Sequence, residues 1–355
     1  MAAVIARFYS ITDAILHQTK DPLFVGKTWV KSVNPSVMFS GNGDLSCKEA
    51  ARLSRMAEAR RLGRLWFGET VVRDATILAA VAAINTKEIG IGTSIINVFT
   101  RSPGQLAMLA GTLNELSSGR FTLGLGTSTA AIVEGWHGQH YSSPAKRLEE
   151  VIALLRNYFS GERFSFSGES YSPSGARLKG LPRPAIALAA LNDVMVRKAA
   201  ILADQVILNL SNLERVRQVR EMIDMEARKT GRIGRPKLSM MLYAYVLGDG
   251  DQGLMAAKDL FTFYSSAPAY RKLFSRLGYK REAEEMERLW SQRDRSAIPR
   301  VISRAMIDDL MVVGGISDLR QRVRQFEENG VDEVMIAPCP TSRFVENADL
   351  VIREV

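Results

Sequence analysis

EIGIGTSIINVFTRSPGQLAMLAGTLNELSSGRFTLGLGTS, residues 88–128, carries the clearest structural signal in the chain. Apolar segments at 88–96 and 121–128 have the pattern of β-strands. Between them, a helix-like segment opens with Ser102 and Pro103, which are typical of a helix cap and first turn. Nearly continuous apolar strands indicate burial on both faces, as in parallel sheets. The stretch therefore predicts a strand–helix–strand unit of an α/β protein.

The same alternation continues on both sides of this unit. Strands are predicted at 35–41, 64–69, 88–96, 121–128, 185–191, 205–211, 238–247 and 331–338. Most of them are separated by segments with helical spacing, such as the one behind Asp74 and the one that begins with a Ser46–Glu49 capping box. Eight strand–helix units in about 300 residues are typical of a TIM (β/α)8 barrel. An open, doubly wound sheet is the alternative.

The expected organisation is one barrel domain over residues 34–355, preceded by an N-terminal extension, 1–33. Residues 250–310 are charged and largely helical, which predicts a helical insertion before the last strand. Within it, FTFYSSAPAYRKLF (261–274) is a candidate roof for a substrate pocket. The alternative for this segment is a dimer surface.

Composition narrows the class of protein. The longest apolar run, 75–84, is too short for a membrane span, which needs about 20 residues. The first 17 residues show no secretory signal, so we expect no membrane partner. Cys47 and Cys339 lie far apart and neither belongs to a CxxC motif, which excludes a disulfide framework or zinc ribbon and favours a reducing cytoplasm.

The net charge of +9 suits an anionic partner of some kind. Nucleic acid, an anionic membrane and an anionic small molecule are the candidates. The basic residues are scattered, and no recognition-helix or aromatic-interleaved pattern accompanies them. We therefore predict no nucleic-acid partner and expect a small-molecule substrate.

Small and polar residues gather where the predicted strands end, which is where barrels place their function. Two successive strands end in GIGTS (90–94) and GLGTS (124–128). Glycines there allow close approach to the backbone, and the hydroxyls could contact a phosphate or a planar heterocycle. The alternative is a tight turn at the barrel rim. Thr129 stands where a dinucleotide fingerprint needs its third glycine, so that motif is not met.

Titratable residues follow two of these strands. Glu69 could anchor a polar ligand or move a proton, or it could be a helix cap or pair with Arg73. EGWHGQH (134–140) holds two of the three histidines. His137, with Glu134, is a candidate acid/base or substrate contact, and a structural histidine is the alternative. No matching ligand cluster appears elsewhere, so no metal is predicted.

Residues 92–138, from GTSIINVF through LGLGTSTAAIVEGWHG, resemble the luciferase-like flavin and deazaflavin oxidoreductases. The likeness is to the branch that uses coenzyme F420, which includes methylenetetrahydromethanopterin reductase and F420-dependent glucose-6-phosphate dehydrogenase. Weaker similarity extends over 34–355. The resemblance implies a TIM barrel with an insertion and a cofactor lying across the carboxyl ends of the strands.

The resemblance also implies site residues. It places a non-proline cis peptide at Ser94–Ile95, behind the central ring of the deazaflavin. It gives the cofactor contacts from the strand ends and from the start of the helix after the fifth strand, where backbone and packing would hold the phosphate tail. These contacts are Glu69, Ser94, Ile95, Asn97, Thr127, Ser128, Leu191, Asn192, Val194 and Met195.

The function implied is hydride transfer between F420 and an unidentified small organic substrate. Thr70 and Thr129 replace a histidine and a glutamate of the sugar-phosphate dehydrogenase, and its phosphate-binding lysine is absent from 209–212. Oxidation of glucose 6-phosphate is therefore not expected. The alternatives are an FMN-dependent monooxygenase and a non-catalytic flavin-binding barrel. Homo-oligomers are common among the proteins resembled, which leaves one open here.

Overall fold

The computed structural model describes residues 34–355 except residue 233, so the expected extension 1–33 lies outside the described residues. Ten strands of the described part join in one sheet. They are β1 (Ser36–Phe39), β2 (Arg64–Phe67), β3 (Gly90–Thr93), β4 (Ile96–Asn97), β5 (Phe121–Gly126), β6 (Ala185–Ala189), β7 (Gln205–Asn209), β8 (Lys237–Tyr245), β9 (Val312–Val313) and β10 (Glu333–Pro338).

Eight of these strands close into a ring in the order β1-β2-β3-β5-β6-β7-β8-β10. Every pairing is parallel, and β10 closes the ring because it pairs with both β8 and β1. The short strands β4 and β9 add to β5 and β8. The predicted TIM barrel is thus confirmed with all eight expected strands, and the open doubly wound sheet is wrong.

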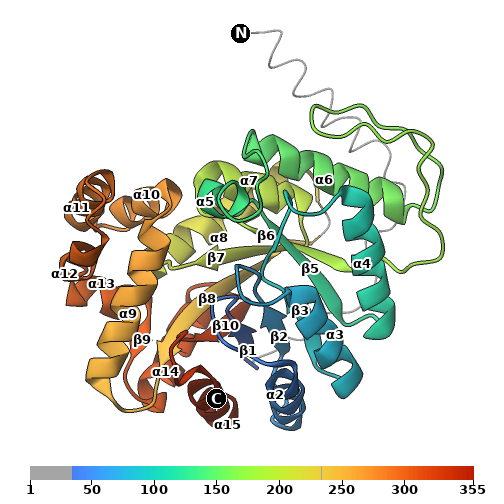
Figure 1. The fold of residues 1–355 in the computed structure, drawn as a ribbon. Helices are drawn as coiled ribbons and strands as arrows, with labels where there is room; N and C mark the ends of the chain where they lie inside the picture. Colours follow the sequence, from blue (N-terminus) through green and yellow to red (C-terminus); the bar gives the residue numbers. More distant parts are fainter. Residues whose placement is uncertain (1–33, 233) are drawn as a thin grey trace. The chain divides into compact units, whose positions relative to one another are not determined.

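Helices surround the barrel (Figure 1). They are α2 (Cys47–Ala59), α3 (Ala75–Asn85), α4 (Pro103–Leu116), α5 (Ala130–Val133), α6 (Pro144–Phe159), α7 (Asp193–Leu202), α8 (Leu213–Lys229), α9 (Gly250–Ser265), α10 (Pro268–Arg276), α11 (Lys280–Ser291), the 3-10 turn Arg295–Ala297, α12 (Ile298–Val301), α13 (Arg304–Leu310), α14 (Ile316–Glu328) and α15 (Phe344–Glu354). No helix of this described part is long and apolar enough to cross a membrane.

The helices α2 and α4 begin at the residues predicted from the sequence. Ser46 caps α2 in a reciprocal capping box with Glu49. Ser102 caps α4 in the same way with Gln105, and Pro103 occupies the first turn. Side-chain caps satisfy amide groups that the helix itself leaves without partners, so they fix where each strand-to-helix loop ends.

Helices α9 to α13 lie between β8 and β9 and gather on one side of the barrel (Figure 1). Their buried side chains, which include Phe261, Phe274 and Met286, belong to one apolar cluster with residues of the barrel interior such as Tyr243. Residues 250–310 are therefore helical, as expected, and they pack on the barrel through its interior side chains.

A buried carboxylate lies at the end of the barrel where the strands begin. Glu333 opens β10 and accepts hydrogen bonds from Ser36 Oγ (2.6 Å), Trp66 Nε1 (2.8 Å) and Gln205 Nε2 (2.8 Å). Arg64 Nε lies 3.6 Å from the same carboxylate. Burial acts to raise the pKa of Glu333, but the Arg64 charge and these hydrogen bonds outweigh it and lower the pKa. This end is filled by a structural network.

Candidate active site

A cavity of about 1170 Å³ lies at the carboxyl ends of the strands. Residues that follow β1, β2, β3, β5 and β6 line it, together with side chains from β7 and β8. Helix α10 and the last turn of α9 supply another wall. Nine of the predicted site residues belong to this lining: Glu69, Ser94, Ile95, Thr127, Ser128, Leu191, Asn192, Val194 and Met195. The segment 261–274, expected as a roof, contributes Phe263, Tyr264, Tyr270 and Leu273, among others.

The end of β3 carries the expected backbone feature. The peptide bond between Ser94 and Ile95 is cis, as the resemblance predicted. Ser94 is buried, and its hydroxyl has no hydrogen-bond partner among the described residues. Buried polar groups in proteins are normally paired, so this hydroxyl at the cavity is a candidate ligand contact.

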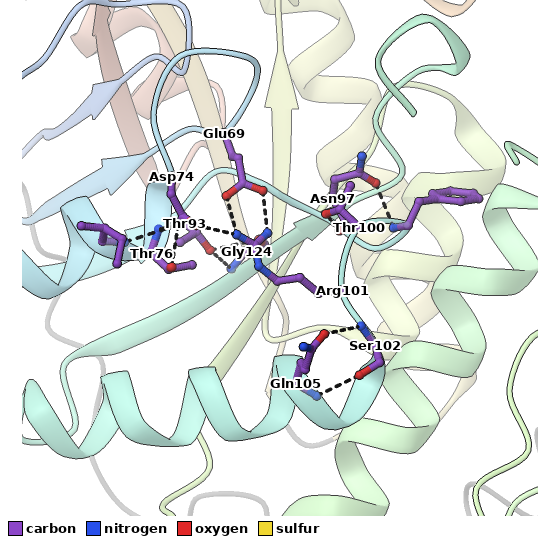
Figure 2. A network of polar contacts seen from close by, with 12 residues as sticks. Glu69, Asp74, Thr76, Thr93, Asn97, Thr100, Arg101, Ser102, Gln105 and Gly124 are labelled. Carbon is purple, nitrogen blue, oxygen red and sulfur yellow. Dashed lines mark hydrogen bonds and ion pairs between the residues drawn. The ribbon is translucent and has the colours of Figure 1, made fainter. Parts of the chain in front are cut away.

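Glycine at the end of β5 is required by close packing. A Cβ on Gly124 would lie 1.8 Å from the carbonyl oxygen of Thr93, which no side chain tolerates. The Thr93 hydroxyl instead accepts a hydrogen bond from Gly124 N (3.0 Å) and donates one to Gly124 O (3.1 Å) (Figure 2). A Cβ on Gly126 would lie 2.9 Å from the side chain of Ile95. These glycines therefore let β3 and β5 meet closely beneath the cavity.

Thr127 and Ser128 follow β5 at the cavity wall. Ser128 has a left-handed φ of 55°, which is uncommon for a residue with a side chain. The hydroxyl of Tyr141 donates to the Ser128 carbonyl at 3.3 Å. Burial raises the pKa of Tyr141, which keeps this hydroxyl protonated as a donor. Tyr141 therefore helps to hold the strand-end turn in place.

Glu69 is held by an arginine that sequence reasoning did not pair with it. Arg101 donates from Nη1 to Glu69 Oε1 at 2.6 Å and from Nη2 to Oε2 at 2.8 Å (Figure 2). Arg101 also contacts Asp74, the cap of α3, at 3.0 Å. Arg73, the partner considered from the sequence, pairs with Asp44 instead. The Glu69 carboxylate is therefore fixed at the cavity wall by a bidentate ion pair.

Arg101 forms ion pairs with both Glu69 and Asp74. The hydrogen bonds to Glu69 raise the pKa of Arg101, against the effect of burial. Burial acts to raise the pKa of Asp74, but hydrogen bonds from Thr76 and the Arg101 charge lower it overall. Arg101 and Asp74 therefore both stay ionised near neutral pH.

The start of α7 reaches the cavity as expected. Asn192 caps the helix, with its Oδ1 accepting from Met195 N at 3.0 Å. Leu191, Asn192, Asp193, Val194 and Met195 all line the cavity. The Asp193 carboxylate lies 2.7 Å from Arg215 and 3.8 Å from Arg276. The first turn of α7 therefore faces the cavity with its negative side chain already paired.

Three predicted site residues do not line the cavity. Asn97 is buried in β4, where its Oδ1 accepts from Phe99 N at 3.0 Å. Glu134 is exposed, and its Oε1 accepts from Tyr141 N at 3.1 Å and lies 3.9 Å from His140 Nδ1. His137 is half-buried in the loop after α5. Its neighbour Trp136 lines the cavity and is 62% exposed. The functional roles of Asn97, Glu134 and His137 stay predictions.

Sequence reasoning missed a group of tyrosines. Tyr243 of β8, Tyr264 of α9 and Tyr270 of α10 all line the cavity. Tyr264 and Tyr270 fall inside the segment expected as a roof, but Tyr243 lies in an apolar strand with no signal that distinguishes it from core. Asn209, which ends β7 in the polar run 209–212, lines the cavity beside them.

Within residues 34–232 and 234–355, no group of three or more His, Cys, Asp or Glu side chains is arranged to bind a metal ion. Both cysteines are free, and Cys339 is buried. The charged cluster at the cavity is instead the arginine–carboxylate set around Glu69.

Known proteins resemble this chain over most of its length. 5,10-Methylenetetrahydromethanopterin reductase of Archaeoglobus fulgidus is 27% identical over 273 residues, covering 74% of this chain and 81% of the relative. The structure of the coenzyme F420-dependent tetrahydromethanopterin reductase from Methanopyrus kandleri superimposes with a TM-score of 0.74 at 20% identity, covering 91% of this chain and 98% of that one.

An FMN-bound protein shares the fold as well. The oxygenating constituent of 3,6-diketocamphane monooxygenase from Pseudomonas putida, in complex with FMN, superimposes with a TM-score of 0.65 at 14% identity. It covers 91% of this chain and 97% of its own. A family model described as luciferase-like monooxygenase matches residues 31–333, which confirms the resemblance seen in residues 92–138. The chain thus belongs to the luciferase-like monooxygenase family.

Proposed function

We propose that the cavity binds the deazaflavin coenzyme F420 and that the protein transfers hydride between this cofactor and a small organic substrate. One observation carries the proposal: a single cavity of about 1170 Å³ is lined both by the small residues that end β3 and β5 and by the first turn of α7. A flat ring needs the first feature, and a phosphate-bearing tail needs the second. The coenzyme F420-dependent reductase from Methanopyrus kandleri, which shares the fold, favours F420.

The residues present fit such a group. The buried Ser94 hydroxyl, at the cavity, has no partner within the part of the chain that the structure describes. Amide groups at the start of a helix attract phosphate, and the carboxylate of Asp193 is already paired with Arg215. Lys272 and Arg276 of α10 add positive charge to the lining. Ser94, Ile95, Thr127 and Ser128 would hold the ring, and residues 191–195 the phosphate tail.

The deazaflavin would supply the hydride chemistry. The protein would position the ring and the substrate and exclude water. Glu69 has two proposed roles, to orient the ring or to relay a proton. Both of its oxygens accept hydrogen bonds from Arg101, which fixes the carboxylate and favours the role of orienting a polar edge. His137, with Glu134, remains the proposed acid/base group, and loop 134–140 would have to bring it to the substrate.

FMN is the second candidate cofactor. The FMN complex of the Pseudomonas putida monooxygenase, which shares the fold, favours this alternative. With FMN the protein would be a monooxygenase. A barrel that binds flavin without turnover is the alternative of another class. Because the first-turn amides of α7 would serve the phosphate of either molecule, the cofactor itself has to be tested.

Titration of the purified protein with F420 and with FMN, followed by absorbance and ultrafiltration, tests the proposal. We expect F420 to be retained with a shifted spectrum and FMN to be retained at least tenfold more weakly. Tight FMN binding without F420 binding would reverse the choice of cofactor. Bleaching of the bound deazaflavin in a stopped-flow instrument, with a panel of alcohols, then separates an enzyme from a binding protein.

A further inference from the structure

The wall of the cavity opposite β3 is built from aromatic residues. In the ring of eight strands, β8 is four strands away from β3 in either direction. Tyr243 of β8 therefore lies across the barrel mouth from Ser94 and Ile95, and all three residues line the same cavity. A ring held against Ser94 and Ile95 would leave the space between itself and Tyr243 for a substrate.

Phenol hydroxyls meet at this wall. Tyr243 Oη lies 2.5 Å from Tyr264 Oη. Asn209 Nδ2 donates to Tyr270 Oη at 2.9 Å, and the rings of Tyr264 and Tyr270 have centroids 4.4 Å apart. Tyr264 and Tyr270 are only partly buried, so their surfaces reach the cavity. Three hydroxyls and one amide thus supply hydrogen bonds in one small region.

This region carries no charge. Of the described residues, those that line the cavity from β1, β7, β8 and 263–270 are all neutral. The apolar ones include Met38, Ile207 and Met241, and also Phe263, which is 38% exposed. An ionic substrate group would lose its hydration here without gaining a counter-ion. The charged lining residues of α10, Lys272 and Arg276, follow this region toward the end of the helix.

The hydroxyls are hydrogen-bond donors. Burial is the main cause that raises the pKa of Tyr243, and it also raises the pKa of Tyr264 and Tyr270 well above the ordinary value for tyrosine. All three phenols therefore stay protonated at neutral pH. Asn209 Oδ1 has no partner among the described residues, so the wall also offers one acceptor. Phenol donors beside an amide acceptor can bind a carbonyl or an alcohol oxygen.

We propose that the substrate is an uncharged ketone or alcohol with an aromatic or branched apolar body, and that the Tyr264 hydroxyl binds its oxygen while Tyr243 holds Tyr264 in place. The body of the substrate would pack against Met38, Ile207 and Phe263. The redox step rests on the function proposed above, but the binding preference rests on this wall alone.

Saturation-transfer NMR on the protein incubated with F420 tests this preference with acetophenone as the probe. Benzoate, of similar size but charged, is the matched comparison. We expect acetophenone to bind and benzoate to bind at least tenfold more weakly. Tyr264→Phe removes one hydroxyl and keeps the ring, so acetophenone affinity should fall roughly 3- to 10-fold, the value of one hydrogen bond. Tyr243→Phe should lower it in the same direction.

Tyr279→Phe is the control, because that hydroxyl also belongs to residues 250–310 but binds Asp309 (2.8 Å) and does not line the cavity. It should leave acetophenone affinity unchanged. Equal binding of benzoate and acetophenone, or unchanged affinity in folded Tyr264→Phe, would overturn the inference. F420 binding is measured in the same samples by absorbance. Retained F420 with no acetophenone preference therefore refutes the substrate class alone, whereas loss of F420 binding refutes the proposed function alone.

Discussion

Glu69 and Arg101 meet through two parallel contacts, Nη1 to Oε1 at 2.6 Å and Nη2 to Oε2 at 2.8 Å. Glu69 follows β2, and Arg101 precedes the cap of α4, so the pair ties two strand-to-helix loops together at the cavity wall. Their side chains are 11% and 17% exposed. Bidentate pairs of this kind add geometric precision as well as energy. The pair therefore fixes the Glu69 carboxylate at the proposed cofactor site.

Glu69→Gln should weaken F420 binding and lower turnover, because the amide keeps the shape but cannot hold Arg101 through two charged contacts. We expect at least a tenfold loss of kcat/KM. Arg101 keeps its contact with Asp74, so the loss of unfolding free energy should be about 1–3 kcal/mol. Arg73→Gln is the matched control, since its pair with Asp44 is exposed. Unchanged kinetics in Glu69→Gln would remove Glu69 from the site.

Gly126→Val should block the cofactor while leaving the barrel folded. Even the Cβ would lie 2.9 Å from Cδ1 and Cγ1 of Ile95, so this side chain must move at the cavity wall. We expect F420 affinity to fall at least tenfold, measured by absorbance titration. Gly250→Val is the control, because a Cβ there meets no atom within 4 Å. Full affinity in Gly126→Val would contradict a ligand at the end of β5.

His137→Ala tests the acid/base role that the sequence suggests for this residue. If loop 134–140 brings His137 to the substrate, kcat should fall at least tenfold while F420 affinity is retained. His140→Ala is the comparison, because its side chain is 84% exposed beside Glu134. Equal kcat in the two variants would remove His137 from the mechanism.

Glu333→Gln should destabilise the barrel without touching the cavity. The pKa of Glu333 is lowered from its ordinary value of 4.5, so its ionised form stabilises the native state above that pH. This stabilisation is lost as the pH falls through the lowered, folded-state pKa. We expect Glu333→Gln to lose about 1–3 kcal/mol at pH 7. The difference in thermal unfolding between variant and wild type should begin to shrink below pH 4.5 and disappear only below the lowered, folded-state pKa. Glu115 is exposed, so the control variant Glu115→Gln should have the same thermal stability as the wild type at every pH.

The barrel could be predicted from the sequence because strand burial and helix capping are local patterns. Each of the eight expected strands is present, and the caps at Ser46 and Ser102 are where the sequence places them. The short strands β4 and β9 were not predicted as separate strands; Ile96 of β4 was included in the strand expected at 88–96. Each has two residues, too few to produce a periodic pattern. β4 forms where the chain after β3 runs alongside β5, and β9 forms where the chain before α14 runs alongside β8.

The site could be predicted only where a strand end brings its own residues to the cavity. Ser94 and Thr127 follow that rule. Arg101 was not assigned to Glu69, because Arg73 is nearer to Glu69 in the sequence. Arg73 pairs with Asp44 instead, and only the geometry of the loop determines this. Tyr243 and Tyr264 come together only because β8 and α9 pack on each other, which no spacing in the sequence encodes.

A crystal structure of the protein with bound F420 tests the central claim most directly. We predict the deazaflavin ring in the cavity between Ser94–Ile95 on one side and Tyr243–Tyr264 on the other, with its phosphate at the first turn of α7. Density for the cofactor outside this cavity, or a ring stacked against the tyrosines with no contact to Ser94 or Thr127, would contradict the account.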